Sequence, residues 1–498
     1  MKNHHIRKTA AALAFTAVLC SCSLREYPYG FYSDDNFYKT EADATSALLY
    51  AYNALTFLEY SRGIFYIGDI PTETMSPKTD EAGDVYQLEN WIATNETEQL
   101  EYYFKFCYIA INRANSVLKN ISGASVSDQV KNRITGEAYF PRAWNYFNLM
   151  RTFGKVPVQT RAVSDLSLTT APMAESLDEL FELIRQDSWK AISLLDVNKE
   201  FGRADKVAAQ SLLSKVYLTV ASAKENRAYL YSDMDVEPVE MYDSAAFWSG
   251  KVINDYKAFY DFDDDLKHIY DVEAPDGPEH IFIMPNERTG TQEGNYSKLP
   301  LMFLPSNNSI PFYIKYSDGS LQKANGNGWG VFLCNSDFVE ERFSAVDRRR
   351  TELIHNSIYD ADGNPIVPNQ IQGYFTAKYV DPDFIGERTS ARPYLIRFSD
   401  IALVYAEAAG PEDGLPVVNR IRSRAGLEPL PSGLSVDVYR REVIKERALE
   451  LAFEGNRLFD LRRTASVTLT DIKAAGLSEQ ETAFFPIPQR EIDLNPNL

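Results

Sequence analysis

Small and aromatic residues recur at every third or fourth position through much of the chain between residues 43 and 223. Apolar residues at this spacing share one face of an α-helix, which then needs a partner to cover it. Several of these stretches end in glycine or proline, which are helix-stop signals. The pattern predicts helices over 43–60, 102–118, 136–154, 177–195 and 204–223.

Alanine is often followed four residues later by a large side chain, as Ala143 is by Phe147. Such pairs let antiparallel helices approach closely, and the arrangement resembles tetratricopeptide packing without a strict period. We therefore expect a mainly α protein in which about four degenerate helix pairs form a right-handed superhelical scaffold.

The pattern of apolar and turn-forming residues changes between residues 224 and 395. Short apolar stretches such as HIFIMP and VFLCNS are separated by Asp, Asn, Gly and Pro, which predicts a loop-rich insertion with a few short strands. Helices are expected again over 399–409, 414–424 and 436–462. The chain would then be one compact unit, with a helical region over 22–223, the insertion over 224–395 and a C-terminal helical region over 396–498 packed on the scaffold.

The N-terminus has the pattern of an export signal. Basic residues precede an apolar run over 9–19 that is too short to span a bilayer, which predicts a lipoprotein signal peptide over 1–21. The following LCSC resembles a bacterial lipobox, and Cys22 is the expected lipid anchor because Cys20 would place bulky Leu19 before the cleavage site. Acyl chains on Cys22 would hold the protein at a membrane. The alternative is an ordinary secretory signal with incidental cysteines.

Composition narrows the possible partners. The formal net charge is −19 and the isoelectric point is near 4.9, which disfavours nucleic acid and anionic lipid surfaces because both reward clusters of Lys and Arg. The net charge does not disfavour neutral ligands. With 498 residues and 45% hydrophobic content, the chain can bury a large core.

Cysteine and histidine predict neither a disulfide framework nor a metal site. Beyond the signal only Cys22, Cys107 and Cys334 remain, and the apolar surroundings of Cys107 predict a buried free thiol. Whether Cys107 pairs with Cys334 stays open. No Cys or His residues have ligand spacing, so no cofactor is expected. The acidic stretch 261–271 lacks EF-hand spacing, so a solvated loop is preferred over a structural calcium site.

Four glutamates follow one another at intervals of four in the stretch 436–462: Glu442, Glu446, Glu450 and Glu454. A row of carboxylates is compatible with a metal or acid–base site. Basic residues interleave with the row, however, so that i, i+3 and i+4 ion pairs are available along the helix. We prefer the interpretation of a salt-bridged structural helix.

Several motifs resemble the SusD/RagB family of outer-membrane lipoproteins. The stretch ERALELAFEGNRLFDLRR and the closing FFPIPQREIDLNPNL are similar to its C-terminal signature. Further matches lie at 108–118, 136–158, 202–218 and 392–408, in the expected order over nearly the whole mature chain. Pro141 departs from the pattern, because an interior proline removes a helix hydrogen bond. The helix either restarts there or kinks.

The resemblance implies a role at the cell surface. It implies a glycan-binding lipoprotein, not an enzyme, that is exposed on the outer membrane of a Gram-negative bacterium and needs no cofactor. Its partner would be a SusC-like TonB-dependent transporter, which the protein would cap while delivering oligosaccharide. The lipid on Cys22 would tether the cap beside the pore.

The resemblance also points to two segments for the ligand site, 68–99 and 294–330. A sugar presents an apolar face and hydroxyl edges, so aromatic platforms with nearby amides and carboxylates are needed. Trp91 and Trp329 are the candidate platforms; the alternative for each is a ring buried under its own loop. Trp144, Trp189 and Trp248 lie in helical patterns and are expected in the core. The supporting candidates are Tyr86, Tyr296, Asn95, Asn327, Glu73 and Asp80.

Two other functions compete with glycan capture. Helical-repeat surfaces also grip peptides, and some relatives in this family handle peptides, so oligopeptide import is the main alternative. A glycoside hydrolase would need two carboxylates at a defined separation, and no recognised motif frames the abundant acids here.

Overall fold

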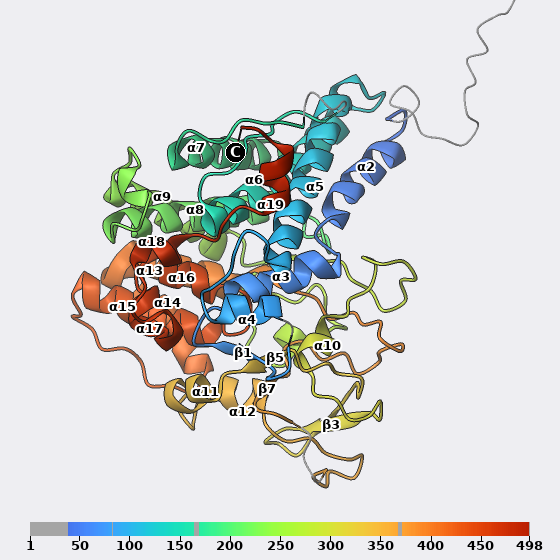
Figure 1. Cartoon of the computed structure of the whole chain (residues 1–498), viewed down its shortest axis with the longest axis vertical. Helices are drawn as coiled ribbons and strands as arrows, with labels where there is room; N and C mark the ends of the chain where they lie inside the picture. The colour runs from blue at the N-terminus through green and yellow to red at the C-terminus, as the bar shows by residue number, and fades with distance from the viewer. Residues whose placement is uncertain (1–37, 82, 164–168, 367–370, 498) are drawn as a thin grey trace, which may run out of the picture.

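The computed structural model describes residues 38–81, 83–163, 169–366 and 371–497 (Figure 1). The expected signal peptide and Cys22 lie outside the described residues. Within those residues, no helix combines the length and the apolar character that crossing a lipid bilayer requires. Helices fill the upper part of the molecule in Figure 1, and the short strands gather in the lower part.

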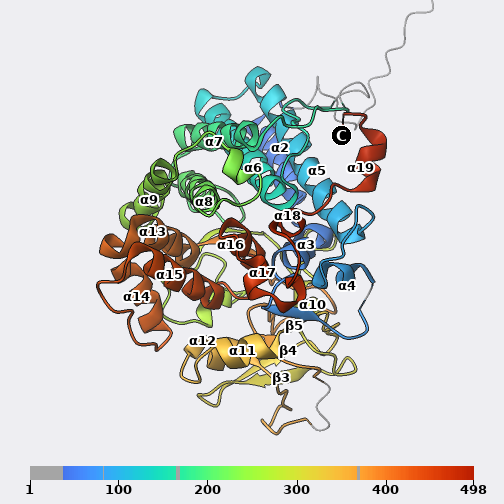
Figure 2. The ribbon, with the colours of Figure 1, turned by 60° about the vertical axis from the view of Figure 1, so that its left-hand side comes forward.

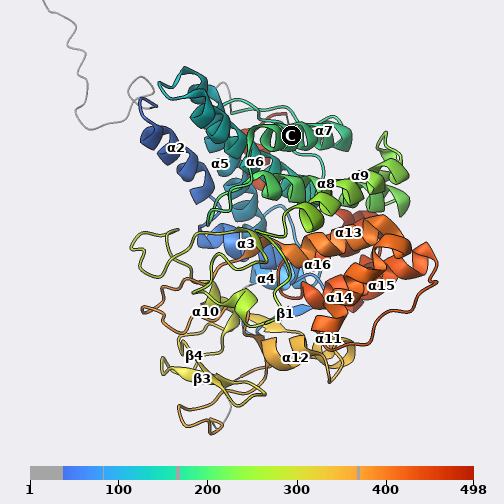
Figure 3. The same cartoon turned by 180° about the vertical axis from the view of Figure 1, so that it is seen from behind.

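Helices that follow one another in sequence pack side by side, from α5 to α9, and α13 continues the stack against α9 (Figure 3). The predicted mainly α fold of tetratricopeptide-like helix pairs is confirmed. Interleaved Ala and aromatic side chains form the core, as Ala143 and Phe147 show. The helices are α2 (Glu41–Asn53), α3 (Leu58–Gly68), α5 (Glu98–Asn120), α6 (Asp128–Phe153), α7 (Leu177–Leu194), α8 (Lys206–Glu225) and α9 (Pro238–Asp255).

Helix α6 continues across Pro141 and does not restart there. Proline has no backbone N–H, so the carbonyl of Glu137, one turn earlier, lacks its usual helical partner. The hydroxyl of Tyr52 on α2 donates a hydrogen bond of 3.3 Å to that carbonyl. A residue from a neighbouring helix therefore compensates for the interruption, and α2 is fixed against α6 at this point.

The sequence analysis placed Trp248 in a helical pattern, but it gave no bounds for helix α9, because this helix lies inside the segment predicted to be loop-rich. Its signal was present in the sequence: Pro238 at the first turn, then Tyr242, Ala245, Trp248 and Val252 at helical spacing. All four of the latter are buried, against α8 and α13.

Past α9, the insertion contains antiparallel two-stranded sheets and short helices. The strand pairs are β1 (Met75–Pro77) with β5 (Phe332–Cys334), β2 (His280–Ile283) with β8 (Tyr394–Arg397), β3 (Phe312–Lys315) with β4 (Leu321–Ala324), and β6 (Ile354–His355) with β7 (Phe375–Thr376). The short helices of the insertion are α10 (Leu299–Phe303), α11 (Ser336–Arg342) and α12 (Arg348–Leu353), and a further short helix, α4 (Gly83–Glu89), precedes α5. Single turns of 3₁₀ helix are η1 (Ile121–Gly123), η3 (Tyr231–Asp233), η4 (His268–Tyr270) and η5 (Ile472–Ala474).

The C-terminal region is helical, but the helix expected over 436–462 is broken at 451–456. Phe453 has φ 64° and Gly455 has φ 75°, which no α-helix accommodates. The turn presses onto α3: a Cβ on Gly68 would lie 2.2 Å from the Gly455 carbonyl oxygen. The helices are α13 (Phe398–Asp413), α14 (Leu415–Arg424), α15 (Val436–Glu450), α16 (Arg457–Arg463), α17 (Val467–Thr470), α18 (Glu479–Ala483) and α19 (Gln489–Leu494).

The row of glutamates on and after α15 is structural, as preferred, but most of its partners come from other elements. Only Glu442 has the expected local pair, with Lys445 at 2.6 Å. Glu446, Glu450 and Glu454 are buried and bind cations from β8, α12, α14 and the 377–393 segment. The ion pairs are Arg349–Glu446, Arg422–Glu446, Arg349–Glu450, Arg397–Glu450, Arg424–Glu450, Arg397–Glu454 and Lys378–Glu454.

Candidate ligand site

Strands β1 and β5 bring the two predicted ligand segments together. Their antiparallel register pairs Pro77 with Phe332, and the Lys78 amide donates to the Val331 carbonyl at 3.1 Å. The chain therefore leaves this pairing with Asp80 on one side and Trp329 on the other. Residues that are far apart in the sequence share one edge of the molecule here.

Trp329 is held by its backbone and leaves its ring accessible. The Trp329 amide donates to the Leu301 carbonyl at 2.6 Å. A Cβ on the preceding Gly328 would lie 2.0 Å from the Leu304 carbonyl oxygen, so only glycine allows this approach. The Trp329 side chain is 38% exposed, which is high for an indole. A rigid backbone with an open ring is what a stacking platform requires.

Polar groups accompany Trp329. The Asp80 side chain is 73% exposed, and its only ion pair is a loose one of 3.7 Å to Lys78 among the described residues. Asn327 lies two residues before Trp329, and its buried Oδ1 accepts no hydrogen bond within the described part of the chain. Tyr86, on α4, is 57% exposed. The two segments thus present an exposed carboxylate and an exposed phenol, whereas the Asn327 Oδ1 is buried.

Trp91 and Asn95 contact the C-terminal segment instead. The half-buried Trp91 indole stacks on Phe485 at 6.0 Å, and its Nε1 donates to Asp471 at 3.1 Å. Asn95 hydrogen bonds to the Gln489 side chain, and its carbonyl accepts from the Gln489 amide at 2.7 Å. These contacts favour the packing interpretation of Trp91, so its role in ligand binding stays a prediction.

The remaining candidates, Glu73 and Tyr296, have partners of their own. Glu73 is paired with Arg457, from α16, at 2.6 Å. The Tyr296 hydroxyl donates to Glu293 at 2.9 Å, which raises the pKa of Tyr296 above its ordinary value. The turn that carries Tyr296 is pressed by Gly294 against the junction of α2 and α3.

The burial of the other three tryptophans agrees only in part with the prediction. Trp144 and Trp248 are buried as expected. Trp189 is 43% exposed, so its assignment to the core was wrong. It packs edge-on against Trp248 at 5.0 Å on the outer side of α7 and α9, where no further layer covers it.

Sequence reasoning missed a large groove of about 910 Å³ along α15. Residues at the ends of α8 and α9 line it, together with residues of α11, α13, α14, α16 and α17. Figure 2 shows where these helices lie. The lining of the groove includes Glu73 and many charged side chains of both signs. The two aromatic rings in that lining, Tyr242 and Phe338, are buried and offer no open face. The groove is therefore poor in sugar platforms.

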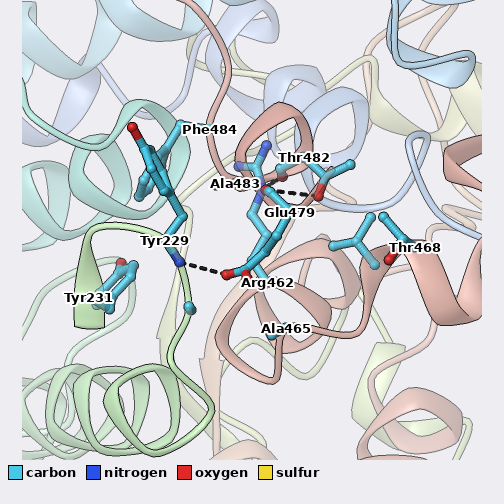
Figure 4. A pocket seen from close by; sticks show the side chains of 11 residues that line it. Tyr229, Tyr231, Arg462, Ala465, Thr468, Glu479, Thr482, Ala483 and Phe484 are labelled. Atoms are coloured by element: carbon cyan, nitrogen blue, oxygen red, sulfur yellow. Dashed lines mark hydrogen bonds between the residues drawn. The ribbon is translucent and has the colours of Figure 1, made fainter. Parts of the chain in front are cut away.

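A pocket of about 20 Å³ lies at Arg462 (Figure 4). Burial lowers the pKa of Arg462 to about 9, and its guanidinium donates to the carbonyls of Thr482 at 2.9 Å and of Arg151 and Thr152 at 3.3 Å. The last two carbonyls end α6, where the helix dipole is negative. Arg462 thus caps α6, and the pocket holds no more than a water-sized guest.

Cys107 is a buried free thiol, as the sequence predicted. Cys107 and Cys334 are both buried and unpaired, and burial raises the pKa of each thiol well above its ordinary value. In the acidic loop, Asp264 pairs with Arg420 and Asp263 with His268. Within the described ranges no group of three or more His, Cys, Asp or Glu side chains is placed to hold a metal ion.

The fold is a helical-repeat scaffold with a loop-rich insertion that leaves the Trp329 ring exposed. A family model described as "SusD family" matches residues 343–498, and one described as "Starch-binding associating with outer membrane" matches residues 40–218. The chain belongs to the SusD/RagB family, as its motifs predicted, and the second family description indicates association with the outer membrane.

Relatives match over nearly the whole chain. SusD-like protein P2 of Formosa agariphila is 26% identical over 93% of this chain and 91% of its own. Starch-binding protein SusD of Bacteroides thetaiotaomicron is 22% identical over 88% and 85%. A solved laminarin-binding SusD-like protein covers 92% of this chain and 98% of its own, with 21% identity and a TM-score of 0.74. Surface glycan-binding protein A of Bacteroides uniformis covers 92% and 99%, with 20% identity and a TM-score of 0.73.

Proposed function

We propose that this protein is a surface-exposed lipoprotein that captures oligosaccharide or polysaccharide at the outer membrane and caps a SusC-like TonB-dependent transporter. The family supports the general role, and relatives whose names state starch, laminarin or glycan binding support the ligand class. The observation that carries the proposal for this chain is the exposed Trp329 on a fixed backbone, in a segment that the β1–β5 pairing joins to the segment carrying Asp80. Binding, without hydrolysis, is the proposed activity.

The chemistry of the Trp329 edge suits a neutral sugar. The apolar face of a pyranose ring can stack on the indole, while Asp80 and Tyr86 exchange hydrogen bonds with hydroxyl groups. The strongly acidic chain would repel polyanionic glycans, so neutral chains are favoured. Trp91, Tyr296, Asn95, Asn327 and Glu73 remain secondary candidates.

Replacing Trp329 by alanine tests the site. We expect Trp329→Ala to weaken glycan binding by about 2 kcal/mol, or roughly 30-fold, because the stacking face is lost. Isothermal titration calorimetry against a panel of neutral polysaccharides measures the change. Trp189→Ala is the matched control, since it removes an equally exposed indole from α7, and we expect its affinity to stay within about twofold.

Trp91→Ala belongs to the same series and separates the two interpretations of Trp91. A packing role lowers the unfolding temperature and leaves affinity unchanged, whereas a ligand role lowers affinity in a stable protein. Glycan binding that survives Trp329→Ala intact would remove the Trp329 edge from the site.

The lipid anchor and the transporter are proposed from the N-terminal motif and the family. We expect Cys22→Ala to release the protein from the membrane fraction, because no acyl chain would then hold it. Fractionation with detection by immunoblot measures this, and Cys20→Ala is the control. Equal membrane retention of the two variants would contradict an anchor at Cys22. Co-purification of the lipidated protein with a barrel-sized membrane partner tests the transporter proposal.

Oligopeptide capture is the second candidate, and the groove along α15 favours it. Two basic residues, Arg342 and Arg441, and two acidic residues, Glu341 and Asp437, line the groove. None of these four side chains forms an ion pair in the described structure. Free charges of both signs suit a zwitterionic chain better than a neutral sugar. Binding of a peptide mixture that Arg441→Met weakens, with no response to polysaccharide, would favour this function. Release of reducing sugar would instead indicate a hydrolase.

A further inference from the structure

A narrow cavity of about 20 Å³ lies between α6, α8, α15 and α16, next to the helix that carries the family signature. Four basic side chains reach it: Arg151, Lys215, Arg447 and Arg463. Asp460 is the one carboxylate in its lining. Such a concentration of cations is unusual in the interior of a protein with a net charge of −19.

The carboxylates around the cavity do not balance these cations. Three of the cations share three carboxylates, and Arg151 adds a fourth positive charge that has no ion pair in the described structure. The local sum is therefore one positive charge in excess. The pairs are Lys215–Asp400, Arg447–Asp400, Arg447–Asp460, Arg463–Asp460 and Arg463–Glu407.

Arg151 is held in place without being neutralised. Its Nε and Nη2 donate to the Asn148 Oδ1 at 3.1 and 2.6 Å, and its guanidinium lies 3.7 Å from the centre of the Phe459 ring. An amide and a ring stabilise a cation less than a carboxylate does. Burial lowers the pKa of Arg151, and burial also lowers that of Lys215, where Arg447 and Arg151 oppose the effect of Asp400.

Two donors that line the cavity remain unused. Arg151 Nη1 and Arg447 Nη2 donate no hydrogen bond to the described residues, although every other guanidinium nitrogen of the two side chains does. Arg447 is buried and Arg151 is half-buried, so an anion would offset part of the cost of desolvating their charges. The cavity therefore has both the charge and the donors to receive an anion.

The volume decides the size of that anion. A cavity of about 20 Å³ holds one guest of the size of a water molecule, since one such guest needs roughly 10–15 Å³ on this measure. Chloride is the common anion nearest to this size, and sulfate, phosphate and sugar carboxylates are larger. A net charge of +1 in the surroundings favours a monovalent anion over neutral water.

We propose that this cavity is a site for a single chloride ion, which binds Arg151 Nη1 and Arg447 Nη2 and completes the charge balance between α6, α8 and the signature helices α15 and α16. The ion would act as a structural link within the scaffold. Its role is separate from glycan capture at the Trp329 edge.

Bromide replaces chloride and scatters anomalously, so it reports the site directly. Crystals of the wild-type protein grown in sodium bromide are expected to show an anomalous peak within hydrogen-bonding distance of Arg151 Nη1. Solvent density in the cavity without an anomalous peak would identify the guest as water and overturn the proposal. This experiment needs no variant and so does not depend on the folding of one.

Stability in two salts gives an independent test. Saturating chloride is expected to raise the unfolding midpoint by about 3 °C over gluconate at equal ionic strength, because gluconate is too large to enter. Arg151→Met should abolish the difference between the salts. Arg113→Met is the control, since Arg113 also stacks on a ring, Tyr50, at 3.6 Å, but lies at the surface and should keep the chloride effect. Equal midpoints of the wild type in both salts would contradict the proposal.

Discussion

Replacing Arg397 by methionine is expected to lower the free energy of unfolding by about 3–5 kcal/mol, because three buried carboxylates would lose their shared cation. Arg397 is 1% exposed. Its guanidinium donates to Glu279 at 2.9 Å, Glu450 at 2.9 Å and Glu454 at 2.8 Å. A methionine of similar length fills the space but leaves these charges facing one another.

The expected loss follows from how strongly the network favours ionised carboxylates. Burial disfavours the charged form of Glu450, yet Arg424, Arg397 and Arg349 together hold its pKa well below the ordinary value. Removing one of these cations exposes the remaining charge to the full desolvation penalty. Arg397→Lys is expected to lose less, since lysine keeps the charge but cannot bridge several carboxylates.

Urea denaturation at neutral pH measures the effect. Arg420→Met is the matched control, because Arg420 forms a 2.6 Å pair with Asp264 that is exposed on both sides. Exposed pairs contribute about 1 kcal/mol or less. If Arg397→Met were no more destabilising than Arg420→Met, the buried network would not hold the C-terminal helices to the insertion.

The contrast between α15 and its partners shows what the sequence could predict. The helix itself follows from local periodicity, and so does its structural role. The identity of Arg397, Arg424 and Arg349 as partners does not, because each is brought in by another element. The break at 451–456 was also missed: Phe453 adopts φ 64°, and the residue type gives no warning of a left-handed conformation.

Some features of the candidate site could likewise be predicted from the sequence, and others could not. The two loop segments were predicted from a family resemblance, but the β1–β5 pairing that joins them depends on three-residue strands too short to recognise by alternation. Exposure of Trp329 and stacking of Trp91 on Phe485 depend on residues far away in the chain. Several helices other than α15 line the groove along it, so no local pattern marks it.

Asp69→Asn is expected to stabilise the protein above pH 7 by an amount of the order of 4 kcal/mol. Asp69 ends α3 and is fully buried; its Oδ2 accepts from the Gly455 amide at 2.7 Å, and its Oδ1 has no partner in the described structure. Burial raises the pKa of Asp69 to about 7, against the effect of the Gly455 and Arg457 amides. Asparagine has the shape of the protonated acid and can accept the same hydrogen bond.

The direction of the pH dependence follows from proton binding. Between about pH 4 and pH 7 the folded wild type keeps the Asp69 proton while the unfolded chain has released it, so stability falls as the pH rises through this window. Asparagine does not titrate, and the difference between variant and wild type should therefore grow from near zero at pH 4 to its full value above pH 7. Urea denaturation of both proteins from pH 4 to pH 9 measures that difference, with the exposed Asp243→Asn as a control whose difference stays flat. A pH-independent difference for Asp69→Asn would mean that the carboxyl is ionised in the folded protein at all these values, and that the turn at Gly455 binds α3 through a charge and not through a neutral acid.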